Sequence, residues 1–430
     1  DAWYKREARE LLPDGFKCRS CGSNEFTKET DILDVWFDSG SSSIAVLENR
    51  EGLRWPADVY IEGGDQFRGW FNSSLMVGLA VHDRAPYDAV LTHGWTLDAQ
   101  GKAMHKSLGN AVSPDEIIPK LGAEVLRLWC ASADYMEDLR CSDEILQRVT
   151  DGYRKLRNTA RFALGNLYDF EPERDSVVES EMLEIDRWAL AELNETVWYV
   201  RDWYERYGFH DVFHTLYDFC TVTLSARYFD IIKDRLYTAA PKSNQRRSAQ
   251  TVLYRIANEL SRMLAPILSF TAEEIWEYLP SSDKRARSVH LTELSSAHDR
   301  ARDRELLARW NKLFSIRDQV LLKLEEARVA KRIGSSLQAC VVIRPRHDDE
   351  ELIRYFWDEL RYIFIVSQVR LAKDKELRGG SLVLNQFGID LAQGQKCERC
   401  WNYSTRVGES SRYPTVCERC VEALVEIEAG

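Results

Sequence analysis

The sequence predicts a multidomain protein in which a parallel α/β segment is followed by an α-helical bundle, a small α+β region and a zinc-binding tail. Three observations support this fold class. Two short apolar runs flank a helical pattern between residues 58 and 93, which is the order of a parallel strand–helix–strand unit. Helical periodicity dominates residues 142–280. Two close cysteine pairs near the end of the chain have the spacing of a zinc ribbon.

Length and composition exclude a disordered chain and a membrane-spanning one. The 430 residues suggest about three domains at roughly 150 residues each. A hydrophobic content of 44% can bury a large core, yet no apolar run approaches the ~18 residues of a membrane span. The net charge of −11 argues against a general nucleic-acid coat protein. Because neither an initiator Met nor a signal peptide is visible, we expect a cytoplasmic protein and part of a longer chain.

Local patterns place the elements of the α/β segment. They predict, in order, a strand over 58–62, a helix over about 66–81, a strand over 89–93 and a polar loop over 98–110. Ser113, Pro114 and Glu116 then mark a helix start. Serine caps the first helical amides, proline fits the first helical position, and a glutamate at the third completes the pattern.

Helical patterns continue beyond residue 142. The sequence Thr271-Ala272-Glu273-Glu274 has the form of a capping box and predicts a helix start at Thr271. Residues 280–303 are polar and predict a linker. The remaining predictions are a charged helix over about 304–332, strands over 337–343 and 366–371 flanking a helix from about 350, and a cysteine module from 393.

The tail carries the strongest local motif, two Cys-x2-Cys pairs separated by 16 residues. Its members are Cys397, Cys400, Cys417 and Cys420. Four thiolates can hold one structural zinc ion at about 2.3 Å, and a large chain without a signal peptide favours metal over disulfides. The residues Arg399, Trp401, Arg406, Arg412 and Arg419 decorate the module and suit either RNA contact or a solvated surface. Cys18 and Cys21 form only half of such a site, and metal binding there stays open.

Polar residues gather where the two predicted strands end. They are Glu62, Gly63, Asp65 and Gln66 after the first strand, and His93 and Gly94 after the second. The carboxyl ends of parallel strands form one edge, where α/β proteins bind ligands. Carboxylate and amide groups beside glycines can bind an amine and ribose hydroxyls. An acidic helix N-terminus also stabilises its own helix, so this simpler interpretation remains open.

Two basic stretches are candidates for phosphate binding. The loop over 98–110 contains Lys102 and Lys106, and a lysine beside the sheet edge can stabilise charge that develops on a phosphate. Three arginines at helical spacing also form one basic face: Arg154, Arg157 and Arg161. This face is a candidate for contact with an RNA backbone. A solvated loop and a solvated helix face are the alternatives.

Four stretches of the sequence together resemble one family. They cover residues 34–42 (DVWFDSGSS), 60–71 (YIEGGDQFRGWF), 93–110 with the loop AMHKSLGN, and CERCW from Cys397. The chain resembles the C-terminal half of bacterial isoleucyl-tRNA synthetases, which are class I enzymes. The resemblance extends over essentially the whole chain.

The resemblance implies that the full enzyme activates isoleucine with ATP and Mg²⁺ as isoleucyl-adenylate and charges tRNA(Ile). It implies that Glu62 contacts the adenylate, that Asp65 and Gln66 bind the amine or the ribose, and that Trp70 lies near the amino-acid pocket. It places His93 and Gly94 near the adenine or ribose. It also implies that Lys106 is the second lysine of the family's K-M-S-K-S loop and acts on the phosphates. The helical region would bind the anticodon arm, and the zinc tail would help to hold the tRNA.

The sequence also departs from the family pattern. Ala103 and His105 stand where the loop usually has its first lysine and first serine, although Lys102 can substitute partly, and Phe67 stands where the family has His. The N-terminal ATP motif and the editing insertion are absent from this sequence, so we expect the chain alone to be inactive. The alternative is a stand-alone, noncatalytic tRNA-binding paralogue. A valine-specific relative is disfavoured by the zinc tail.

These expectations together give five parts. They are a connecting segment with a Cys pair (1–45), the C-terminal half of a Rossmann-like class I catalytic domain (46–141), a helical anticodon-binding domain (142–300), a long helix with a small α+β junction (301–392), and the zinc tail (393–430). The expected partners are tRNA(Ile), isoleucine, ATP and the N-terminal half of the same enzyme. We expect no membrane contact and a monomer.

Overall fold

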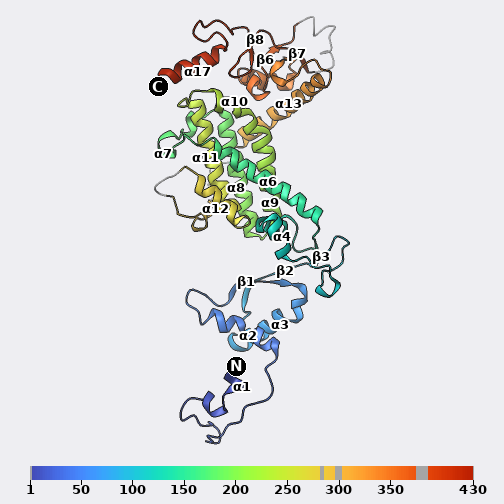
Figure 1. Cartoon of the computed structure of the whole chain (residues 1–430), viewed down its shortest axis with the longest axis vertical. Helices are drawn as coiled ribbons and strands as arrows, with labels where there is room; N and C mark the ends of the chain where they lie inside the picture. The colour runs from blue at the N-terminus through green and yellow to red at the C-terminus, as the bar shows by residue number, and fades with distance from the viewer. Residues whose placement is uncertain (1, 281–284, 296–302, 374–385, 430) are drawn as a thin grey trace. The chain divides into compact units, whose positions relative to one another are not determined.

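The computed structural model describes residues 2–280, 285–295, 303–373 and 386–429 (Figure 1). The chain divides into two compact units. The first contains residues 1–103 and 135–139, and the second contains residues 104–134 and 140–430.

The first unit is built on two parallel strands, β1 (Ala57–Gly63) and β2 (Tyr87–His93). Between them along the chain lies α3 (Trp70–His82), which packs against α2 (Val35–Leu47). The predicted parallel strand–helix–strand unit is therefore confirmed. Its other elements are α1 (Ala2–Lys5), β3 (Thr96–Leu97) and two 3₁₀ helices, η1 (Ala8–Leu11) and η2 (Gly64–Arg68).

The helix predicted from about residue 66 begins later in the structure. Residues Gly64–Arg68 form a 3₁₀ turn, and the α-helix starts only at Trp70. Gly69 breaks the helix between them because its backbone, with φ −110° and ψ −118°, is neither helical nor extended. The Trp70 amide donates to Gln66 Oε1 at 3.1 Å, so the side chain of Gln66 satisfies an amide that a continuous helix would have bonded.

The second unit begins with helices and confirms the predicted helical region. Its helices up to residue 280 are α4 (Pro114–Leu121), α5 (Ala123–Ser132), α6 (Asp143–Gly165), α7 (Pro172–Asp175), α8 (Glu184–Glu205), α9 (Phe209–Asp218), α10 (Asp230–Thr238), α11 (Asn244–Leu264) and α12 (Ser269–Tyr278). The start of α4 is as predicted, because Ser113 caps it by accepting from Asp115 N. The central helix α11 packs against α6, α8 and α12.

The predicted capping box at Thr271 is wrong. Helix α12 already begins at Ser269, and Thr271 is a buried residue within it, whose hydroxyl bonds that of Tyr153 at 2.9 Å. The cap comes from another helix, because the Glu124 carboxylate of α5 accepts from the amides of Phe270 and Thr271 at 3.1 and 3.0 Å. A negative charge at this position also favours the helix dipole.

Helix α9 continues into α10 through a π-helical stretch, η5 (Phe219–Phe229), which local patterns did not predict. Beside it lies the fully buried carboxylate of Asp186. It accepts hydrogen bonds from Tyr228, Arg235 and Ser248, so the buried charge is fully partnered. Burial, followed by the nearby Asp186 charge, raises the pKa of Tyr228 well above its ordinary value.

The small α+β region follows the long helix α13 (Arg304–Val329). Its sheet has the order β6-β5-β7, in which β5 (Ala339–Ile343) pairs in parallel with β6 (Gln368–Leu371) and antiparallel with β7 (Phe387–Leu391). Helices α14 (His347–Tyr355) and α15 (Leu360–Ile363) connect β5 to β6. The two predicted strands and their helix are confirmed, and β7 is an additional strand.

Short elements complete the described part of the chain, and among them β4 (Leu139–Arg140) pairs with β3. The others are η3 (Lys106–Leu108), η4 (Glu179–Glu181), η6 (Val289–Leu291) and η7 (Ser336–Gln338), then β8 (Gln395–Lys396), β9 (Tyr403–Ser404) and α17 (Glu418–Ala429) in the tail. Of the predicted linker, residues 281–284 and 296–302 lie outside the described part. No described helix has the length and hydropathy needed to cross a membrane.

Candidate functional sites

The ends of β1 and β2 lie side by side, as predicted. Gly63 stands opposite His93 in the parallel register. A Cβ atom placed on Gly63 would lie 2.7 Å from Asp65 Oδ1 and 3.5 Å from His93 Cε1. Only a glycine therefore leaves the Asp65 carboxylate in this position, close to the strand end. Glu62, the preceding residue, is exposed.

Gln66 fixes the orientation of its neighbours at this edge. Its Nε2 donates to Asp65 Oδ2 at 3.1 Å, and its Oε1 accepts from the amide of Trp70. Both ends of the Gln66 side chain are thus engaged within the protein. The arrangement makes Gln66 a support for Asp65 as well as a candidate ligand contact.

The N–H group of Trp70 is already hydrogen-bonded within the protein, so only the ring could contact a ligand. The indole Nε1 donates to the Ser39 carbonyl at 3.0 Å, and the ring stacks on Tyr60 with centroids 4.0 Å apart and planes at 5°. Tyr60 is buried on β1. Trp70, the first residue of α3, therefore links this helix to α2 through a hydrogen bond and to β1 through ring stacking.

A segment that sequence patterns did not single out, residues 135–139, lies against Gly94 and Trp95. The amide of Gly94 donates to the Tyr135 carbonyl at 2.9 Å, and a Cβ atom on Gly94 would lie 2.3 Å from the Glu137 carbonyl oxygen. The Trp95 amide donates to Asp138 Oδ1 at 2.7 Å. Glycine is required at position 94 because residues 135–139 approach its backbone.

The predicted phosphate loop starts as a tight turn. Asp98 Oδ1 accepts from the amides of Gln100 and Lys102 at 3.0 and 2.9 Å, and Leu97 forms a β-bridge with Ala103. Lys106 opens η3 in the second unit. The Lys106 side chain lies outside the described part of the structure, so its catalytic role stays a prediction.

The three predicted RNA-binding arginines line one cavity of about 630 Å³ on α6 and α12. Arg157 forms a bidentate ion pair with Glu274 of α12, at 2.6 and 2.8 Å. This hydrogen-bonded partner lowers the pKa of Glu274. Arg154 lies 3.2 Å from Asp151, whereas the exposed Arg161 has no ion pair with any described residue.

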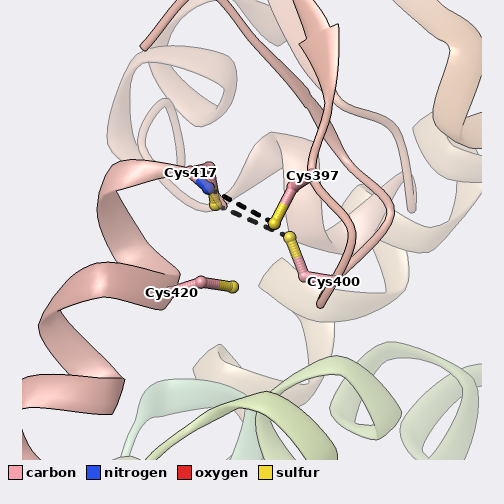
Figure 2. A group of neighbouring side chains, drawn as sticks. All are labelled: Cys397, Cys400, Cys417 and Cys420. Carbon is pink, nitrogen blue, oxygen red and sulfur yellow. Dashed lines mark hydrogen bonds between the residues drawn. The ribbon is translucent and has the colours of Figure 1, made fainter. Parts of the chain in front are cut away.

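The four tail cysteines converge in the structure (Figure 2). All four sulfur atoms lie within 4.8 Å of one another, and Cys400 Sγ is 3.6 Å from Cys417 Sγ. Zinc–sulfur bonds of about 2.3 Å in a tetrahedron place sulfur atoms about 3.8 Å apart, so the arrangement fits a zinc ion. All four are buried.

The surroundings of these sulfurs also fit a metal. The amide of Cys417 donates to Cys397 Sγ at 3.3 Å, as backbone amides do around metal-bound thiolates. Hydrogen bonds from Cys417 and Cys420 lower the pKa of Cys400, while hydrogen bonding to Cys400 raises the pKa of Cys417 to about 11. Four thiols this close share protons, which a zinc ion would displace.

The Cys18–Cys21 pair does not gain further ligands. Backbone hydrogen bonds from Cys21 and Ser20 lower the pKa of Cys18. Among the described residues, only the tail cysteines form a group of three or more metal-ligating side chains. The pair therefore remains half of a site.

Comparisons with known proteins agree with this division of sites. The family described as "tRNA synthetases class I (I, L, M and V)" matches residues 1–142, the "Anticodon-binding domain of tRNA ligase" matches 186–343, and the "Zinc finger found in FPG and IleRS" matches 394–423. An isoleucine–tRNA ligase from Syntrophotalea carbinolica is 50% identical over 99% of this chain. Ligases from Moorella thermoacetica and Carboxydothermus hydrogenoformans are also 50% identical, over 99% and 100% of it. The chain belongs to the isoleucine–tRNA ligase family.

The chain spans about half the length of these ligases, covering 46%, 47% and 46% of them in the same order. Among solved structures, LeuRS of Agrobacterium radiobacter K84, in a ternary complex with tRNA and LeuAMS, is similar with a TM-score of 0.52 and 18% identity. The match covers 68% of this chain and 35% of that one, and it supports the fold alone.

Within the isoleucine–tRNA ligase family, the matched regions assign the candidate sites to different parts. The sheet edge lies in the class I match, and the four cysteines lie in the zinc-finger match, which together with their geometry confirms the predicted zinc site. The arginines of α6 lie between the class I and anticodon-binding matches. Because the relatives are ligases, the alternative of a noncatalytic paralogue is not favoured.

Proposed function

We propose that the chain supplies one side of the aminoacylation site, the tRNA-binding bundle and the zinc tail of an isoleucine–tRNA ligase. The whole enzyme would activate isoleucine with ATP and Mg²⁺ and transfer it to tRNA(Ile). The observation that carries this proposal is 50% identity to isoleucine–tRNA ligases along 99% of the chain. Because the chain spans less than half of that relative, the activity is proposed for the chain together with the remaining length.

The proposed chemistry begins at the sheet edge. The isoleucine carboxylate attacks the α-phosphorus of ATP, and pyrophosphate leaves. Asp65, held by Gln66, offers a carboxylate for the amine or a ribose hydroxyl, and Glu62 offers a second one. The Nδ1 atom of His93 forms a hydrogen bond with the Gly94 carbonyl at 2.9 Å, so Nε2 is the ring nitrogen that would contact the adenylate. Trp70 forms one wall of the amino-acid pocket, and Lys106 stabilises the phosphates.

The exposed apolar side chains of the first unit support a partner segment. Ile61 on β1 is 59% exposed and Val90 on β2 is 38% exposed. Parallel sheets occur almost only with both faces covered, and two parallel strands are too few to stand alone. We assign this covering role to the N-terminal half of the same enzyme.

The five parts expected from the sequence are retained as the proposed domain organisation. The connecting segment comprises residues 1–45, and the C-terminal half of the catalytic domain comprises 46–141. The anticodon-binding domain comprises 142–300, the junction 301–392 and the zinc tail 393–430. The arginines of α6 contact the tRNA backbone. We propose a monomeric, cytoplasmic enzyme.

The test is isoleucine-dependent ATP–pyrophosphate exchange. We expect no appreciable exchange by this chain alone and exchange by the chain in its full-length context. In that context Lys106→Ala should lower the rate about 10²–10³-fold, because a donor to charge that develops in the transition state typically has this effect. Lys102→Ala is the matched control. Equal exchange by wild type and Lys106→Ala, or a larger loss in Lys102→Ala, would refute the assignment of Lys106.

A further inference from the structure

The two cysteine knuckles of the tail contain the same four residues. Residues 397–400 and 417–420 both read Cys-Glu-Arg-Cys. Each arginine therefore lies between two metal-ligating cysteines, and both arginines reach the same helix, α10. Arg399 donates to the carbonyl of Thr238, and Arg419 forms a bidentate ion pair with Asp234, with one of its bonds at 2.9 Å.

Arg399 also contacts the sulfur cluster. Its Nη1 donates to Cys420 Sγ at 3.7 Å, so one guanidinium joins a cysteine of one knuckle to the last turn of α10. Four thiolates and one zinc ion carry a net charge of −2, because each coordinating thiol is deprotonated. These sulfurs are buried, and a buried negative charge requires cationic or hydrogen-bonding partners.

The contact between the tail and α10 includes these polar groups. A cavity of about 340 Å³ separates α17 from the end of α10, lined by Thr238 and Ser243 on one side and by Glu422 and Glu426 on the other. The apolar cluster of the tail consists of the cysteines and Val416, with other tail residues packed on it, and includes no residue of α10. The alanines that line the cavity, Ala239, Ala240 and Ala423, are small, and Arg399 and Arg419 supply hydrogen bonds and an ion pair across this seam.

We infer that Arg399 and Arg419 couple zinc binding to the docking of the tail on α10. Bound zinc would hold the four sulfurs as a negative cluster that stabilises the two guanidinium groups in the orientation seen here, in which they bond the carbonyl of Thr238 and the carboxylate of Asp234. Asp234 is thereby a positioning residue for a metal site that it does not contact. Coupling between two sites is reciprocal, so docking strengthens zinc binding by the same factor by which zinc strengthens docking.

The first test measures zinc affinity of the whole chain by competition with a chromophoric chelator. Asp234→Asn and Arg399→Gln should each weaken zinc binding by at least about 5-fold, the lower end of typical coupling between sites. Arg406→Gln is the matched control, because Arg406 lies in the tail but pairs with Glu409 at 2.8 Å instead of α10. Affinities of Asp234→Asn and Arg399→Gln within twofold of this control would overturn the inference.

The second test measures hydrogen exchange of the amides at 235–239 and does not depend on the stability of one variant. In the wild-type chain, removing zinc with a chelator should accelerate their exchange. In the zinc-loaded double variant Arg399→Gln/Arg419→Gln, exchange should already be fast. The amide of Tyr403, which donates to Ser367 Oγ at 2.7 Å, reports the separate attachment of the tail to the junction sheet. The coupling would be refuted if removing zinc left the exchange rates at 235–239 unchanged in the wild type. It would also be refuted if these rates still depended on zinc in the double variant.

Discussion

Replacing Glu274 by Gln should strengthen tRNA binding by the proposed basic face. In the structure the Glu274 carboxylate holds both terminal nitrogens of Arg157, at 2.6 and 2.8 Å. A phosphate that binds Arg157 must therefore compete with this carboxylate. Glutamine keeps the shape of the side chain but removes the charge, so Arg157 becomes available to the RNA.

The size of the effect follows from the exposure of the pair. The side chains of Arg157 and Glu274 are 43% and 47% exposed, and exposed ion pairs typically contribute about 0.2–1 kcal/mol because water and salt screen them. Removing the competitor should thus raise tRNA affinity about 1.4- to 5-fold. One further phosphate contact should also make the slope of log affinity against log salt more negative by about 0.7–0.9.

The measurement is a salt titration of tRNA binding to the whole chain. Glu277→Gln is the control, because it removes the same charge from an exposed position on α12 without a described ion pair. Arg161→Gln should flatten the slope by about 0.7–0.9, since Arg161 has no ion pair among the described residues. If Glu274→Gln and Glu277→Gln change the slope equally, the RNA responds only to net charge and the role of Arg157 is refuted.

Three further outcomes follow from single positions. Purified chain should contain about one zinc ion, and Cys417→Ser should lose it in elemental analysis; retained zinc would contradict the site. Gly40→Ala should lower the free energy of unfolding, measured by denaturant titration, by about 1–3 kcal/mol, because the new Cβ would lie 2.8 Å from the backbone of α3. Gly165→Ala is the control, since its Cβ would have no atom within 4 Å, and it should be neutral or stabilising. Burial raises the pKa of Asp169, but hydrogen bonds from Arg246 and Gln250 outweigh it and the net pKa is lowered. The stability from this carboxylate is therefore present above about pH 4 and lost as pH falls through the lowered value; Asp169→Asn should lower stability at pH 7 by about 1.5–3 kcal/mol and reduce its decline in acid, and an unchanged pH profile would contradict this.

Features encoded by neighbouring residues could be predicted from the sequence. Ser113 caps α4 through the amide of Asp115, two residues away. The zinc site follows from spacing alone, because each Cys-x2-Cys pair needs only a tight turn to present two sulfurs. The ends of β1 and β2 meet because parallel strands align their carboxyl ends. In each case the information lies within one element or one connection.

Features that depend on distant residues could not be predicted in the same way. The helix start at Ser269 rather than Thr271 is determined by Glu124, which lies about 145 residues earlier. The requirement for glycine at position 94 arises from residues 135–139, which no local pattern marks. The π-helical stretch likewise carries Tyr228, which donates to the buried Asp186 of α8, and Asp186 also accepts from Ser248 of α11. These details depend on contacts between elements that are distant in the sequence.

The basic and aromatic side chains of the zinc tail fall into two groups according to their contacts. Arg399 and Arg419 face the protein, whereas Trp401 is 59% exposed, with Lys396 5.3 Å from its ring centroid. Trp401 holds a left-handed backbone with φ 64°, a conformation that costs energy for a bulky residue, and it directs an aromatic and a cation to solvent together. Such a pair suits stacking on an unpaired base.

If the tail contacts tRNA, Trp401 is the residue on which that contact should depend. Trp401→Ala should weaken tRNA binding by about 1–3 kcal/mol, or about 5- to 150-fold, without loss of zinc, because its side chain contributes no ligand to the cluster. Trp401→Phe should retain most of the affinity, since stacking needs a ring rather than an indole N–H. Binding to tRNA and zinc content are measured on the same preparations. Equal affinities of Trp401→Ala and wild type would show that the tail serves the fold of this chain and leaves RNA contact to the helical bundle.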